Sequence, residues 1–182
     1  MTVMPEFEAF CAVYEQGQAQ VVSASLVADL ETPVSVMLKL ADGQANAFLL
    51  ESVEGGAVRG RFSIIGMKPD IIWRFKRRQA EINRQARITA DAFEPCDEDP
   101  ITALRALIAE SRIDLPADLP PMAAGLFGYM GYDAVRLVED IPDSNPDDLA
   151  VPDGMFVRPT LICIFDRLED VITAVTPVWP SD

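Results

Sequence analysis

FLLESVEGGAVRGRFSIIG, residues 48–66, joins two runs of apolar residues through a segment with two adjacent glycines. Apolar runs on either side of a glycine-containing turn predict a β-hairpin. Glu51 and Ser52 end the first run, and Arg59 and Arg61 begin the second. A carboxylate, a hydroxyl and a guanidinium at close range can bind both ends of a zwitterion such as an amino acid. The stretch is therefore either an ordinary hairpin or part of a pocket for a small charged ligand.

The sequence around this stretch predicts an α+β fold with a mainly antiparallel sheet and two or three helices. Apolar residues at helical spacing predict an amphipathic helix over residues 5–15. Asp99 can cap a second helix that starts at Pro100 and ends near Arg112, and residues 132–140 predict a short third helix. Runs rich in branched and aromatic residues predict strands at 21–30, 32–43, 47–53, 61–67, 70–76, 156–165 and 171–178.

Three glycines at three-residue spacing mark GLFGYMGYD, residues 125–133. The spacing is not that of a phosphate-binding loop. We expect these glycines to let a strand approach a neighbouring backbone closely, with Phe127, Tyr129 and Tyr132 filling the space around them.

The charge and the residue counts limit the classes of partner and site that this chain could have. The chain has 15 basic and 29 acidic residues and a net charge of −14, which disfavours nucleic acids and anionic membranes as partners. Six basic side chains gather between residues 74 and 87, which predicts a solvated strand edge, with a polyanion site as the alternative. There is no histidine, and the three cysteines have neither zinc nor disulfide spacing. No apolar run is long enough to span a bilayer, so we expect a cytoplasmic protein. Without histidine, catalysis would need carboxylates, lysine or a metal, and the acidic clusters among prolines at 139–152 predict a solvated loop rather than a metal site.

Several motifs together resemble one enzyme family. They are FLLESVEGG (48–56), GRFSIIGMKP (60–69), GLFGYMGYDAVRLVED (125–140) and PDGMF (152–156), preceded by TPVSVMLKLADG (32–43). In this order they resemble the N-terminal domain of anthranilate synthase component I, a chorismate-utilising enzyme. The resemblance covers nearly the whole chain, residues 1–182. Component I of aminodeoxychorismate synthase is a near alternative.

The resemblance implies a regulatory part of a larger lyase of tryptophan biosynthesis. The full-length family member converts chorismate to anthranilate and pyruvate with Mg²⁺, using ammonia from a glutamine amidotransferase partner, and L-tryptophan inhibits it by feedback. Carried over to this chain, Leu50, Glu51 and Ser52 would line the tryptophan pocket, with Arg59 or Arg61 assisting. The family's chorismate and Mg²⁺ ligands lie in a C-terminal catalytic domain that this chain lacks, so we expect the chain alone to be inactive.

Two other functions remain open from the sequence. One is a stand-alone amino-acid-binding module, which would need a pocket completed within 182 residues or by self-association. The other is a structural domain whose tryptophan site has decayed. A regulatory fragment should expose an apolar patch where the catalytic domain would pack, which a stand-alone module should not.

Overall fold

The computed structural model describes residues 2–53, 59–142, 144 and 146–180, which form two compact units. The first unit comprises Met1–Pro69, Ile113–Gly125 and Pro159–Asp182, and the second comprises Asp70–Arg112 and Leu126–Arg158. The helices are α1 (Phe7–Tyr14), α2 (Pro33–Ala41) and α3 (Pro100–Glu110), with 3₁₀ helices η1 (Pro121–Ala123) and η2 (Tyr132–Leu137). The strands are β1 (Val3–Met4), β2 (Gln20–Val27), β3 (Phe48–Val53), β4 (Arg59–Lys76), β5 (Gln79–Asn83), β6 (Glu94–Pro95), β7 (Phe127–Met130), β8 (Gly154–Asp166) and β9 (Val171–Val178).

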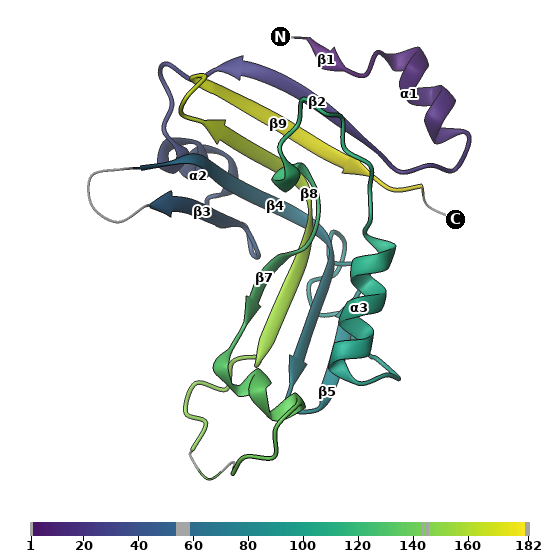
Figure 1. The fold of residues 1–182 in the computed structure, drawn as a ribbon, viewed down its shortest axis with the longest axis vertical. Coiled ribbons are helices and arrows are strands. Elements are labelled where there is room, and N and C mark those ends of the chain that lie inside the picture. Colours follow the sequence, from purple (N-terminus) through teal and green to yellow (C-terminus); the bar gives the residue numbers. More distant parts are fainter. Residues whose placement is uncertain (1, 54–58, 143, 145, 181–182) are drawn as a thin grey trace. The chain divides into compact units, whose positions relative to one another are not determined.

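The sheet confirms the predicted fold class. Among the described strands the order is β1-β2-β9-β8-β4-β5-β6, with β3 beside β4 and β7 beside β8 (Figure 1). The pairings whose register can be described are antiparallel. The longest of them joins β2 to β9, from Gln20 opposite Val178 to Val27 opposite Val171.

The core of the first unit lies between α2 and the sheet. Val36 and Ala41 of α2 pack with Ile65 and Met67 of β4, together with Cys163, Phe165 and Ile172 from β8 and β9. The first helix contributes less to burial than its apolar spacing predicts, because Phe7 is 79% exposed and none of the α1 side chains is buried.

The core of the second unit lies between α3 and the ends of β4 and β5. Trp73 and Phe75 of β4 are fully buried there, with Ala103 and Leu107 of α3 against them. Asp99 caps α3 as predicted: its Oδ1 accepts hydrogen bonds from the backbone N–H groups of Ile101 (3.0 Å) and Thr102 (3.2 Å).

The prediction of a strand over residues 32–43 was wrong, because this segment contains α2. Thr32 and Ser35 form a reciprocal capping box: the Ser35 N–H donates to Thr32 Oγ1 (3.1 Å) and the Thr32 N–H donates to Ser35 Oγ (2.9 Å). Pro33 follows the cap at the first helical position. The alternating apolar residues suggested a strand, but the two buried side chains, Val36 and Ala41, are an odd number of positions apart and would lie on opposite faces of a strand.

Other boundaries also differ from the predictions. The strands expected at 61–67 and 70–76 form one strand, β4, and residues 132–137 form a 3₁₀ turn. The close approach predicted for Gly128 is confirmed, because a Cβ there would collide with the backbone oxygen of Met155 across the β7–β8 pairing. Tyr132, however, is 87% exposed and fills no interior space.

Candidate functional site: an edge hairpin in the first unit

The quoted stretch forms the antiparallel hairpin β3–β4, with residues 54–58 outside the described part of the chain. Phe48 lies opposite Gly66, Leu50 opposite Ile64 and Glu51 opposite Ser63. The register shifts between Glu51 and Val53. In the described sheet β3 pairs with β4 and lies off the main strand order, so Leu50 to Ser52 occupy an edge strand whose outer side can accept a ligand.

The pleat divides the predicted site residues between the two faces of the hairpin. Side chains alternate across a strand, and directly paired residues share a face. Glu51 therefore shares a face with Ser63 and Arg61. Leu50 lies on the opposite face with Ile64, and Ser52 joins it there because its side chain lies against Gly60. The four predicted residues with described side chains, Leu50, Glu51, Ser52 and Arg61, are thus near one another in the hairpin without forming a single cluster.

Arg61 is bound by a carboxylate of its own unit. Its Nε donates to Asp166 Oδ1 (2.9 Å) and its Nη2 donates to Asp166 Oδ2 (2.6 Å), which is the two-pronged geometry typical of a strong pair. The hydrogen bonds to Asp166 raise the pKa of Arg61, and those from Arg61 lower the pKa of Asp166. Arg61 thereby ties β4 to the end of β8. The side chain of Arg59, the other predicted arginine, lies outside the described part.

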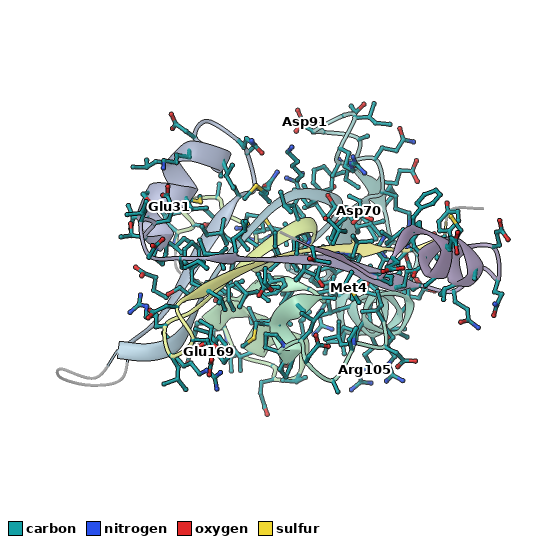
Figure 2. The ribbon with its side chains drawn as sticks, turned by 90° about the horizontal axis from the view of Figure 1, so that it is seen from above. Met4, Glu31, Asp70, Asp91, Arg105 and Glu169 are labelled. Atoms are coloured by element: carbon teal, nitrogen blue, oxygen red, sulfur yellow. The ribbon has the colours of Figure 1, made fainter. Side chains whose placement is uncertain are left out.

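Glu51 also has a cationic neighbour, which the sequence analysis missed. Arg167 Nη2 donates to Glu51 Oε1 (2.9 Å) and to the hydroxyl of Ser63 (3.1 Å). Arg167 lies in the turn between β8 and β9, more than a hundred residues after Glu51. Figures 1 and 2 both place this turn, which also carries the labelled Glu169, beside the hairpin. In the sequence, Arg167 appears only as one residue of a charged turn, and nothing there indicates that it contacts Glu51.

Two glycines of β4 allow β3 side chains to lie flat across the hairpin. A Cβ at Gly60 would collide with the side chain of Ser52 and lie 2.9 Å from its backbone oxygen. A Cβ at Gly66 would collide with the ring of Phe48. Between these two positions Leu50 remains 50% exposed. This face of the hairpin therefore presents an exposed aliphatic side chain next to an exposed hydroxyl.

The basic residues between 74 and 87 do not form the expected strand edge. Arg74 and Lys76 lie on β4, which has β8 and β5 as neighbours in the sheet. They alternate with the buried Trp73 and Phe75, so they form the solvated face of an interior strand. Several carry acidic partners: Arg74 binds Glu81, Lys76 binds Asp147, and Arg84 binds Glu110.

The described residues hold no metal-binding cluster of three or more histidine, cysteine, aspartate or glutamate side chains. Cys11, Cys96 and Cys163 are free thiols, and burial raises the pKa of Cys163. No helix in the described part of the chain has the length and apolarity needed to cross a membrane.

Comparison with known proteins gives clear relatives. No protein-family model matches the chain. It is 53% identical over 178 residues to anthranilate synthase component 1 of Cereibacter sphaeroides, covering 98% of this chain and 36% of that protein. The protein of the same name from Thermus thermophilus is 39% identical, covering 84% of this chain and 31% of the relative. The chain thus spans about a third of the length of these curated relatives.

A solved structure agrees on the fold. Anthranilate synthase component I from Streptococcus pneumoniae superposes with a TM-score of 0.51 over 81% of this chain and 30% of that chain, at 23% sequence identity. The molecule is therefore an α+β protein with an antiparallel sheet. It is homologous to anthranilate synthase component 1 and corresponds to the N-terminal portion of that protein, which confirms the resemblance seen in the motifs.

Proposed function

We propose that this chain is the regulatory portion of an anthranilate synthase component 1 and carries part of an L-tryptophan feedback site on the β3–β4 hairpin. The observation that carries the proposal is the exposed pair Leu50 and Ser52 on an edge strand, with the carboxylate of Glu51 on the adjacent position. An aliphatic surface suits an indole ring, a hydroxyl can donate or accept a hydrogen bond, and a carboxylate suits an ammonium group. The 53% identical relative favours the anthranilate branch over the aminodeoxychorismate branch.

The geometry revises how a zwitterion would be bound. Arg61 is committed to Asp166 by two hydrogen bonds, so it contributes to the architecture of the hairpin. Leu50 and Ser52 lie on one face of β3 and Glu51 lies on the other, so a ligand that contacts all three lies along the open edge of this strand. The rest of the pocket comes from outside the chain. Tryptophan bound there would favour an inactive arrangement of the whole enzyme through its higher affinity for that arrangement.

The catalytic function belongs to the longer protein. We propose that this protein converts chorismate to anthranilate with Mg²⁺, and receives ammonia from a glutamine amidotransferase partner. The described residues of this chain do not provide a fitting set of Mg²⁺ ligands. In this proposal, the contribution of this chain is to bind the inhibitor.

The test is inhibition of the full-length enzyme by L-tryptophan. In Ser52→Phe, the larger ring occupies the ligand space beside Leu50. We therefore expect the tryptophan concentration for half-inhibition to rise at least about tenfold, which corresponds to a loss of about 1.4 kcal/mol in binding free energy. Ser25→Phe places the same ring on an exposed serine of β2 and serves as the matched control. Unchanged inhibition in both Ser52→Phe and Glu51→Gln would refute a tryptophan site on this hairpin.

A further inference from the structure

We propose that Arg167 is a positioning residue of the amino-acid site, which holds the Glu51 carboxylate in place for the ammonium group of the ligand. The inference rests on the proposed function, because it takes Glu51 as a ligand contact. It adds to the site a residue that lies far from the hairpin in sequence and that no motif indicates.

The backbone of Arg167 is fixed to the hairpin. Its N–H donates to the carbonyl oxygen of Arg61 (3.0 Å), and the preceding residue, Asp166, binds the side chain of the same arginine. Asp166 Oδ1 also accepts the N–H of Leu168 (3.0 Å), which shapes the turn between β8 and β9. The backbone of Arg167 is therefore held next to β4, and its side chain extends from this defined position.

The guanidinium of Arg167 bridges the two strands at one register position. Nη2 contacts Glu51 Oε1 on β3 and the hydroxyl of its cross-strand partner, Ser63, on β4. Ser63 is fully buried, whereas the Glu51 side chain is 39% exposed. The contact with Ser63 is thus a rigid anchor for Arg167. The contact with Glu51 restricts a side chain that would otherwise sample several rotamers.

The geometry leaves Glu51 able to bind a second cation. Arg167 donates to Oε1, and Oε2 has lone pairs of its own. The Arg61–Asp166 pair provides the contrast, because both carboxylate oxygens of Asp166 accept from Arg61 and the Asp166 side chain is 13% exposed. Asp166 therefore holds the turn against the hairpin through Arg61. Glu51 is the carboxylate that stays accessible to a ligand, and Arg167 of the same turn orients it.

The experiment is a double-mutant cycle in the full-length enzyme, measured as the L-tryptophan concentration for half-inhibition, with each variant compared with its own uninhibited rate. We expect Glu51→Gln and Arg167→Gln each to raise this concentration about tenfold, the scale of one hydrogen bond to a charged group. The double variant should match Glu51→Gln alone, because Arg167 acts through Glu51. Arg167→Lys, which keeps the charge but loses the planar fork, should be intermediate.

Arg84→Gln is the matched control. Arg84 also pairs with a glutamate, Glu110, through hydrogen bonds of 2.7 and 2.9 Å, but it lies in the second unit. We expect its half-inhibition concentration to equal that of the unmodified enzyme.

The outcomes separate this inference from the function on which it rests. If Glu51→Gln shifts inhibition and Arg167→Gln does not, the positioning role is wrong and the tryptophan site stands. Additive effects in the double variant would mean that Arg167 acts independently of Glu51, which also overturns the inference. If neither Glu51→Gln nor Ser52→Phe shifts inhibition, the proposed function itself fails. Should Arg167→Gln fail to fold, the same cycle with Arg167→Lys decides the matter.

Discussion

Ser52 owes its position to the glycine across the hairpin. The space beside Gly60 is filled by the Ser52 side chain and backbone, so β3 and β4 approach closely at this point. Glycine permits such close contact because it has no Cβ. A residue that does not itself contact a ligand can therefore determine where the exposed hydroxyl lies.

Gly60→Ala tests this dependence. The added methyl group overlaps Ser52, and overpacking of this kind lowers the free energy of unfolding by about 1–3 kcal/mol. Urea denaturation of the chain measures the change. The control is the pair Ser52→Gly and Ser52→Gly/Gly60→Ala: with the serine side chain removed, the added methyl should destabilise less. An equal loss in both backgrounds would contradict the proposed contact.

At the scale of elements, the helix caps were informative where the apolar pattern was ambiguous. The signal Asp99-Pro100 predicted the start of α3 correctly, and the structure shows that carboxylate bound to the first turn. Thr32-Pro33 is the same kind of signal at the start of α2, but strand-like alternation was given more weight there. A local cap with a defined hydrogen-bond geometry is stronger evidence than a short alternating run.

The cap of α3 gives a prediction for pH. The hydroxyl of Thr102 donates to Asp99 Oδ2 (2.6 Å), and this bond and those from the backbone lower the pKa of Asp99. Because the pKa of Asp99 is lower in the folded state than in the unfolded chain, the ionised carboxylate stabilises the fold at pH values above its unfolded-state pKa. This stabilisation is lost as the pH falls through the folded-state pKa of Asp99. Asp99→Ala should therefore be destabilised at neutral pH, with its difference from the unmodified chain shrinking in acid.

Thermal unfolding between neutral and acidic pH measures this difference. Asp99→Asn is the control, because asparagine also caps helices and does not titrate in this range. It should retain most of the stability at neutral pH. A gap between Asp99→Ala and the unmodified chain that stays constant with pH would contradict the role of the ionised carboxylate.

At the scale of the whole molecule, each unit has its own core and its own tryptophan. Trp73 is buried in the second unit, and Trp179 lies in the first. Within the second unit, Asp70 on β4 and Arg158 on β8 form a two-pronged pair, with distances of 2.9 and 2.6 Å. The Arg158 side chain is 8% exposed, so this pair is the most enclosed of the ion pairs described here.

Asp70→Asn is expected to destabilise the second unit by up to about 3 kcal/mol, because Arg158 loses a short two-pronged carboxylate partner while another carboxylate neighbour, Glu110, lies farther away at 3.8 Å. Fluorescence-monitored denaturation in a Trp179→Phe background reports on this unit through Trp73. Asp166→Asn, which alters the more exposed pair with Arg61 in the first unit, is the control and should leave the Trp73 transition nearly unchanged. A midpoint that does not move in Asp70→Asn would show that the pair contributes little.

The sequence by itself determined the fold class, the N-terminal cap of α3, the two long C-terminal strands and the hairpin around Leu50 to Ser52. These features depend on neighbouring residues, through alternation, capping and turn chemistry. The motifs, which are equally local, also carried the resemblance to anthranilate synthase component I.

Only the tertiary structure decided how the charges of the site are used. Glu51 and Arg61 are close in sequence, which suggested that together they could bind the two ends of a zwitterion. In the structure, the turn after β8 instead provides an ionic partner for each of them. The pleat also places Leu50 and Ser52 on the face of the hairpin opposite to Glu51 and Arg61. Asp166 and Arg167 reach the hairpin from more than a hundred residues away. Ion pairing depends on distance in space, and the sheet that brings these segments together is set by non-local strand pairing that no short stretch of sequence encodes.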